Sequence, residues 1–516
     1  MTEPTTTTSA AVRARLMQRL RGLRVIHLAP VLALLALSAW ALASPVGSSP
    51  DDDFHLASIW CANDTRTDLC GAGDEATERA VPEGLVKAGC YVRELDESAE
   101  CQTTGSVSLD AADTISTARG NFNREYPPVY YGVMNAFAGT DLYTAALAMR
   151  LVTVLLFVGL GTALFALLPI ARRPAFTWGW LASTVPLGLF IIPSNNPSSW
   201  AVIGVGLGWL ALLGWYETEG RRKIGLGAVF VVATVMAAGS RSDAAIYAVI
   251  GMLVVLVLKL RLERRFALNS ILPAVMFIVC VISVLSSTQT NAAIDGFSDT
   301  AVVTGGAVAA APDTLGLLAF NLLNLPSLWA GAFGTWALGW FDAPVPAVVA
   351  YGSIGVFISL AFVGFGSLSL RKALALAGVG FVLIALPLYV LTAGGDPVGV
   401  EVQPRYLLPG IVLFAGVLAL SAGSRLVRLT RGQAILVLGT LAIIQFISLH
   451  SVLRRYVTGQ DVQGWNIDAG AEWWWSIPFS PMTVLVIGSL AYAGLCVLLA
   501  RASRPVALPA VDGGAR

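Results

Sequence analysis

Long apolar stretches recur along most of this chain, and few of them contain a charged residue. Each runs for about 17 residues or more, which matches the hydrocarbon thickness of a bilayer. The 516 residues are 56% hydrophobic and 13% charged, with a mean hydropathy of +0.72, and one soluble core could not bury so much apolar surface. Because lipid cannot satisfy the polar groups of an irregular backbone, the spans should be helical. The sequence therefore predicts an all-α polytopic membrane protein.

About twelve transmembrane helices are predicted, with a topology set by basic residues. The spans are residues 25–44, 143–170, 175–193, 198–216, 224–240, 244–260, 268–287, 345–367, 373–393, 406–422, 433–452 and 481–500. Arginine and lysine cluster before the first span and after each even-numbered one, so we expect a plasma-membrane protein with both termini cytoplasmic. Two alternatives stay open. Residues 25–44 could be a signal peptide, cut near Ala41-Leu42-Ala43, or residues 314–340 could form a thirteenth span.

The polar segments divide the chain into a membrane domain, three large outer loops and two ends. We predict a basic cytoplasmic N-terminus at 1–24, a transmembrane domain at 25–503, extracytoplasmic loops at 45–141, 288–344 and 453–480, and a cytoplasmic tail at 504–516. The second loop is rich in aromatic residues and is expected to lie at the membrane interface. The inner loops are short and basic. Any chemistry is therefore expected on the extracytoplasmic side.

Four cysteines lie close together in the first outer loop: Cys61, Cys70, Cys90 and Cys101. Cysteines in an oxidising compartment commonly pair, so two disulfides are predicted, although their connectivity cannot be deduced from sequence. A zinc site is the alternative, but the spacings contain no Cys-x-x-Cys pair, which structural zinc sites commonly use.

Just beyond the first span, three adjacent acids precede a histidine: Asp51, Asp52, Asp53 and His55. On a helix, Asp51 and Asp52 would share a face with His55. A partly desolvated carboxylate there could take a proton from an acceptor hydroxyl, and adjacent acids could hold a divalent cation such as Mg²⁺ or Mn²⁺. The alternative is that the acids only cap a loop helix, where they favour the helix dipole.

Further candidate residues lie near the outer ends of the spans. Their side chains suit a sugar or a phosphate, and they are Tyr126, Tyr130, Arg150, Asn195, Asn196, Arg241, Trp340, Asp342, Gln403, Arg405 and Tyr406. Guanidinium groups can grip a phosphate through two hydrogen bonds. Each candidate also has a structural alternative: tyrosines in an interfacial belt, asparagines in a tight turn, or arginines paired locally, as Arg241 could be with Asp243.

The ordered set of motifs resembles predicted membrane proteins grouped as domain of unknown function 2142. Their Asp-Glu-x-x-His element corresponds to Asp51–His55, and their Tyr/His-Pro-Pro-x-Tyr-Tyr element to Tyr126–Tyr131. An Arg-Leu pair corresponds to Arg150-Leu151. The Gly-Trp-x-Asp-x-x-x-Pro element matches Gly339–Pro346, and Gln-Gly-Arg-Tyr-x-x-Pro matches Gln403–Pro409. The resemblance covers most of residues 25–455, with aspartate replacing glutamate at Asp52 and proline replacing glycine at Pro404.

The acidic turn also resembles that of the glycosyltransferase C superfamily, which implies a function. The expected protein is an inverting enzyme that transfers a sugar from a polyprenyl-phosphate donor to a cell-envelope glycan, glycolipid or protein outside the membrane. Asp51 would be the base, Asp52 would support it or hold a metal, and Arg150, Arg241 and Arg405 would bind the donor phosphate. The Ala-, Gly-, Val- and Arg-rich composition is compatible with an actinobacterial envelope enzyme. A lipid or polysaccharide transporter and a non-catalytic assembly protein are the rival hypotheses; no nucleic-acid partner is predicted.

Overall fold

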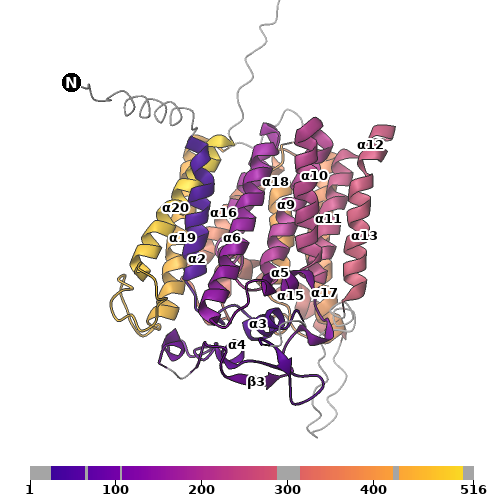
Figure 1. The fold of residues 1–516 in the computed structure, drawn as a ribbon. Helices are drawn as coiled ribbons and strands as arrows, with labels where there is room; N and C mark the ends of the chain where they lie inside the picture. Colours follow the sequence, from indigo (N-terminus) through magenta and orange to yellow (C-terminus); the bar gives the residue numbers. More distant parts are fainter. Residues whose placement is uncertain (1–24, 64–67, 105–106, 288–313, 422–428, 504–516) are drawn as a thin grey trace, which may run out of the picture.

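The computed structural model describes residues 25–63, 68–104, 107–287, 314–421 and 429–503 and is mostly helical. The predicted cytoplasmic ends at 1–24 and 504–516 lie outside these residues. The longer helices are α2 (Ala29–Leu42), α6 (Leu142–Leu167), α9 (Ser198–Glu217), α10 (Gly220–Ala238), α11 (Ser242–Lys259), α13 (Ile271–Ser286), α15 (Thr314–Ala330), α16 (Ala347–Phe365), α17 (Leu370–Gly394), α18 (Pro404–Leu418), α19 (Arg431–Val457) and α20 (Pro481–Ala502). They stand side by side in one bundle (Figure 1).

Shorter elements connect these helices. They are η1 (Val25–Leu28), η4 (Ile170–Arg172), α7 (Arg173–Ser183), α8 (Leu187–Ile191), α12 (Arg264–Asn269) and η5 (Gly331–Thr335). Helices α7 and α8 occupy one predicted span, which Pro186 interrupts because proline cannot continue a helical hydrogen-bond ladder.

Eight helices in the described part of the chain are long and apolar enough to cross a membrane. They are α6, α9, α11, the continuous segment Thr314–Thr335, α16, α17, α19 and α20. Seven coincide with predicted spans, whereas Thr314–Thr335 falls in the predicted outer loop 288–344. Five predicted spans correspond to helices that are shorter, broken or basic at one end: α2, the α7–α8 pair, α10, α13 and α18.

The basic clusters gather at one end of the bundle, which we call the basic end. Glu217 forms ion pairs with both Arg172 and Lys259. Arg371 at the start of α17 donates to the carbonyls of Leu258 and Leu260, 3.2 and 3.0 Å away, at the end of α11. The opposite end carries the described residues of the segment 45–141, and we call it the loop end (Figure 1).

Helix α9 forms the centre of the bundle and is buried along most of its length. Small residues let its neighbours approach closely. A Cβ added at Gly204 would lie only 2.4 Å from the carbonyl oxygen of Ala233 in α10. Close backbone contacts of this kind are typical of helices that pack inside membranes, where dispersion and not hydrophobic burial holds helices together.

Residues 314–346 enter the bundle from the loop end and return to it. Asn321 in α15 bonds with the backbone of Asp396, which follows the loop end of α17. The Trp329 indole donates to Leu383, about halfway down α17, over 3.4 Å. The chain then turns, and the Trp340 indole donates to Gly47 at the loop end over 2.8 Å. The described part of the predicted interfacial segment is thus a helix followed by a returning loop.

The loop end carries a small folded cap. Three short strands, β1 (Gly71–Ala72), β2 (Arg79–Pro82) and β3 (Thr114–Thr117), form an antiparallel sheet in the order β1-β2-β3, with Val81 opposite Ile115. Around the sheet lie α3 (Asp52–Trp60), α4 (Glu83–Lys87), η2 (Ala99–Gln102), η3 (Asn121–Asn123) and α5 (Val129–Asn135). Helix α3 begins directly at the acidic motif, so the cap positions the candidate acids.

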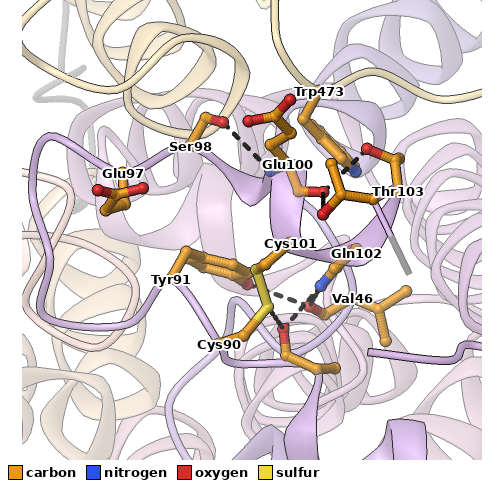
Figure 2. The surroundings of a disulfide bond; sticks show 12 residues. Val46, Cys90, Tyr91, Glu97, Ser98, Glu100, Cys101, Gln102, Thr103 and Trp473 are labelled. Carbon is orange, nitrogen blue, oxygen red and sulfur yellow. Dashed lines mark hydrogen bonds between the residues drawn. A yellow bond between two sulfur atoms is a disulfide. The ribbon is translucent and has the colours of Figure 1, made fainter. Parts of the chain in front are cut away.

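Two disulfides form in this cap, Cys61–Cys70 and Cys90–Cys101, which confirms the prediction and fixes the connectivity. Figure 2 shows how the second one is tied to the segment before Asp51. Tyr91, next to Cys90, and Gln102, next to Cys101, donate to the carbonyl of Val46 over 3.0 and 2.8 Å. The Cys90–Cys101 bridge therefore helps to hold the start of the acidic turn.

Replacing Cys90 and Cys101 together by serine should lower the stability of the protein by about 2–4 kcal/mol, the usual effect of removing a native disulfide. The thermal midpoint in detergent, compared with that of a Cys280→Ser variant, measures the loss. Cys280 is an unpaired cysteine buried in α13. An unchanged midpoint would show that the bridge is dispensable for the cap.

Candidate active site

The acidic motif lies in a tight turn that leads into α3. Asp51 is the N-terminal flanking residue of the helix and has a left-handed backbone, with φ of 60°. Aspartate tolerates this conformation better than most residues. The amide of Ser49 donates to Asp52 Oδ2 over 3.1 Å and closes the turn. As a result the Asp51 side chain stays about one-third exposed, whereas Asp52 is fully buried.

Two residues from distant helices hold the carbonyl of Pro50. Asn196 Nδ2, from the turn before α9, donates to it over 2.8 Å, and Arg405 Nη1, in the first turn of α18, over 2.9 Å. The other terminal nitrogen of Arg405 forms an ion pair with Asp51. Arg119 forms a second ion pair with Asp51, at 3.1 Å, and also pairs with Asp53. Asp51 is thus placed between two guanidinium groups.

These arginines determine the charge of Asp51. Burial by itself would raise the pKa of Asp51, but Arg405 opposes that effect, with help from Arg119, and the pKa falls to about 2. Asp51 is therefore a carboxylate at any physiological pH. Its negative charge allows Asp51 to accept a proton, although its low pKa makes it a weak base in the free protein.

Arg241 brings a further positive charge to this region. It lies just before α11, is 3% exposed, and pairs with Asp243 through bonds of 2.8 and 3.2 Å. Its guanidinium carbon lies 4.4 Å from the ring centre of Tyr406 and 5.4 Å from that of Tyr126. Arg405 contacts the same Tyr406 ring at 5.1 Å.

Several donors in this group have no partner among the described residues. Nη1 of Arg241 and Nε of Arg405 are both buried and unbonded. Buried polar atoms usually have partners, so unsatisfied donors on two neighbouring cations favour the binding of an anion.

His55 lies behind this site among aromatic rings. Its Nδ1 is 3.0 Å from the Tyr131 hydroxyl, and its ring meets that of Tyr126 edge to face at 5.5 Å. Burial lowers the pKa of His55 well below its usual range, even though Asp51 is close. The imidazole is therefore neutral. Its contacts fit a role in holding the Tyr126 ring against Arg241 better than a role in proton transfer.

Asp52 and Arg150 lie deeper than Asp51. Burial raises the pKa of Asp52 to about 7, although Arg150 opposes the shift. Arg150 is fully buried, and its guanidinium donates to the carbonyls of Ala41, Ser44 and Pro45 over 2.6–3.0 Å. This geometry caps the end of α2. It favours a structural role for Arg150 over the phosphate contact that the motif suggested.

Trp340 and Asp342 form contacts that hold the segments around the site together. Asp342 is 2% exposed and pairs with fully buried Arg455 at 3.0 Å. The amide of Trp340 donates to the same carboxylate over 3.1 Å, and its indole reaches Gly47. These contacts join the returning loop to the acidic turn. They favour a scaffold role for both residues over direct substrate contact.

The remaining candidates line or approach the same region. Gln403 borders a small cavity together with Pro50, Arg405, Trp336 and Phe341, and its Oε1 has no partner among the described residues. Asn195 is fully buried with both amide atoms unbonded in the described part of the chain. Tyr130 is fully buried against Trp200, with ring centres 5.4 Å apart.

A metal site was one hypothesis for the adjacent acids. Within the described residues, no group of three or more histidine, cysteine, aspartate or glutamate side chains could hold a metal ion. Asp52 is enclosed and Asp51 is committed to arginines. A divalent cation would therefore need ligands from the substrate.

Two contributors to this end of the molecule were not singled out from the sequence. Arg119 lies in an irregular segment between β3 and η3, where no motif marks it. Arg455 falls within the third predicted outer loop, 453–480, yet it lies in the last turn of α19 and bonds to the backbone of Tyr91 over 2.8 Å. Only the folded arrangement reveals these partners.

The fold and site define a helical membrane protein with an acid and several arginines gathered at one end. The chain belongs to the predicted membrane protein family of domain of unknown function 2142 (DUF2142), whose family model matches residues 34–414. This match includes the acidic turn and Arg405 and ends before Arg455. Among curated proteins, none is significantly similar to the chain.

Proposed function

We propose that this protein is an inverting glycosyltransferase of the glycosyltransferase C type. It takes a sugar from a polyprenyl-phosphate donor and transfers it to a cell-envelope glycan, glycolipid or protein. The observation that carries the proposal is the position of Asp51 beside Arg405, next to Arg241 with its unbonded donor. This combination places a base beside a candidate anion site.

The donor phosphate is assigned to Arg241 and Arg405. Both guanidinium groups contact the Tyr406 ring, so they are close enough to act on one anion. A phosphate would satisfy their unbonded donors and reduce the repulsion between two neighbouring cations. Gln403 and Trp336 border the adjoining small cavity and could contact the first isoprene units or the sugar.

In the proposed reaction, the hydroxyl oxygen of the acceptor attacks the anomeric carbon of the donor sugar. The bond between that carbon and the phosphate oxygen breaks, and polyprenyl phosphate leaves with the bonding electron pair. The hydroxyl proton passes to Asp51, and the configuration at the anomeric carbon inverts because a single displacement occurs. The arginines stabilise the negative charge that grows on the leaving phosphate.

We place the basic end in the cytoplasm and the loop end outside. The paired basic clusters at Arg172, Lys259 and Arg371 support this orientation through the positive-inside rule. Because residues 314–346 return to the loop end, we infer that the chain crosses the membrane twelve times and that both termini are cytoplasmic. The two disulfides are consistent with an oxidising exterior for the cap.

The rival hypotheses fit the site less well. A transporter would need a polar path between the two ends, yet central helix α9 is buried and apolar. A non-catalytic assembly protein has no need of buried, unbonded arginine donors beside an ionised acid. The experiment below separates an enzyme from both.

Membranes containing the full chain should transfer label from at least one radiolabelled polyprenyl-phosphate sugar to an endogenous acceptor. Arg241→Gln should raise the KM for that donor by roughly 10- to 100-fold, because a charge-assisted bond is lost, with a smaller effect on kcat. Arg93→Gln, at an exposed position of the cap, is the matched control. If the Arg241→Gln variant and the wild type transfer sugar at the same rate at a limiting donor concentration, Arg241 does not bind the donor phosphate.

A further inference from the structure

A second cavity lies between α2, α6, α7 and α20, and its lining residues are distinct from those of the candidate active site. Its volume is about 350 Å³, and most of its lining is apolar, for example Ala33, Leu37, Phe157, Phe176 and Leu495. Sites for small molecules commonly measure roughly 300–1,000 Å³. The cavity is therefore large enough for part of a ligand.

The depth of this cavity corresponds to one leaflet of a bilayer. Along α6 it extends from Ala166, near the basic end, to Phe157. Nine residues of helix span about 14 Å, and the hydrocarbon of one leaflet is about 15 Å thick. Small side chains at Ala29, Ala33 and Gly161 contribute to the free space. An extended hydrocarbon chain matches this shape.

Two arginines lie near the basic end of the cavity, and of these only Arg173 lines it. Arg173 lines it and donates to the carbonyl of Phe165 over 3.2 Å. Arg222 donates to the carbonyl of Leu168 over 2.6 Å, at the same end of α6. Among the described residues neither arginine has a carboxylate partner, whereas neighbouring Arg172 is paired with Glu217. The end of the cavity near Arg173 therefore carries positive charge that no carboxylate among the described residues compensates.

We propose that this cavity binds one acyl chain of an anionic glycerophospholipid from the leaflet at the basic end. The phosphate of the lipid lies between Arg173 and Arg222, and the chain runs toward Leu37. Charge complementarity and the one-leaflet depth identify the ligand as an anionic membrane lipid. Because the cavity is lined by neither Asp51 nor the arginines assigned to the donor phosphate, this lipid is separate from the proposed sugar donor.

The test uses the full chain in nanodiscs that contain a photoreactive phospholipid with a diazirine near the end of one acyl chain. Phosphatidylglycerol and phosphatidylcholine versions are compared, and the labelled peptides are mapped by mass spectrometry. Phosphatidylglycerol should label peptides of α2, α6, α7 and α20 about tenfold more than phosphatidylcholine does, since only its net charge complements the arginines.

Two variants and their controls localise the effect. Ala33→Phe should fill the cavity and reduce the labelling by both lipids, while Val31→Phe, on an exposed face of the same helix, should not. If Ala33→Phe does not fold, Ala33→Leu replaces it. Arg173→Gln should remove the preference for phosphatidylglycerol, whereas exposed Arg221→Gln should retain it.

Three results would overturn the proposal. Equal labelling by the two lipids would mean that the cavity takes any surrounding acyl chain. Labelling unaffected by Ala33→Phe or its substitute would place the lipid outside the cavity. Displacement of the label by equimolar polyprenyl phosphate, but not by unlabelled phosphatidylglycerol, would identify the occupant as an isoprenoid lipid. None of these results depends on transferase activity, so the proposed function is tested separately.

Discussion

Asp51→Asn should lower kcat for sugar transfer by roughly 10²- to 10⁴-fold, the usual contribution of a general base. The amide cannot accept the hydroxyl proton, yet it keeps the shape of the side chain and one oxygen for Arg405. The KM for the donor should change much less, because Arg241 and Arg405 remain. Transfer from labelled polyprenyl-phosphate sugar, measured at saturating donor and matched protein level, gives the ratio.

Asp53→Asn is the matched control, since Asp53 lies in the first turn of α3 and shares Arg119 with Asp51. That variant should keep at least a third of the wild-type rate. Asp51→Glu should retain intermediate activity, because a carboxylate remains although its reach changes. Equal rates for Asp51→Asn and wild type would remove Asp51 as the base and favour the assembly hypothesis.

The low pKa of Asp51 has a mechanistic consequence. In the free protein, Arg405 is the strongest influence that lowers the pKa of this carboxyl to about 2, against the effect of burial. A donor phosphate bound at Arg405 would compete for the guanidinium and screen its charge. The basicity of Asp51 would then rise only when the donor is present. Asp51 would then become an effective base only in the complex with the donor.

The candidate site was largely predictable because each of its parts flanks a membrane span. Four residues of the site lie next to different helices: Asp51, Asn196, Arg241 and Arg405. Successive spans run in opposite directions, and this places all four residues at the same end of the bundle. Contacts such as that between Arg405 and Pro50, 355 residues apart, therefore follow from topology. The motifs identified the residue types, and the helices brought them together.

Hydrogen-bond partners separate residues that the sequence assigned to the same role. Arg150 and Arg405 were both predicted to bind the phosphate, with Arg405 as the first choice, and in the structure Arg150 instead donates to three carbonyls at the end of α2. Which carbonyls an arginine meets depends on where a neighbouring helix ends, and hydropathy does not define that point. Arg119 was missed for a related reason, because its partners Asp51 and Asp53 approach it only after the cap has folded.

The membrane helices show the same limit of prediction from sequence. Hydropathy located most of them, but it could not distinguish a crossing from a segment that turns back. Gly334 lies within the turn of residues 314–346 with φ of 99°, a conformation that glycine adopts readily. Pro186 likewise divides one predicted span into α7 and α8. Such breaks depend on single residues that an averaged hydropathy does not register.

The largest effect on stability is expected from Arg455→Leu, which should destabilise the protein by about 3–5 kcal/mol. Arg455 is fully buried, donates to both the carbonyl and the carboxylate of Asp342, and bonds to the backbone of Tyr91. Leucine would leave Asp342 as an uncompensated charge, and the cap would lose the Arg455 hydrogen bond to Tyr91. The thermal midpoint in detergent measures the change.

Arg454→Leu is the matched control, one residue earlier on the same helix. Arg454 also bonds to carbonyls, those of Gly464 and Asn466, but it has no carboxylate partner among the described residues. Its loss should lower the midpoint less. A double variant, Arg455→Leu with Asp342→Leu, should recover part of the loss, because it removes both charges together.

The pH dependence of Arg455→Leu distinguishes a lost charge pair from lost packing. Burial already raises the pKa of Asp342, and Arg455 is the main opposing influence. Without Arg455, the pKa of Asp342 in the folded state rises further above its pKa in the unfolded chain. The folded variant is therefore more stable with Asp342 protonated than with Asp342 ionised. Stability of the variant should therefore fall as pH increases from 5 to 8, relative to wild type. A difference in midpoint that stays constant across this range would assign the loss to packing alone.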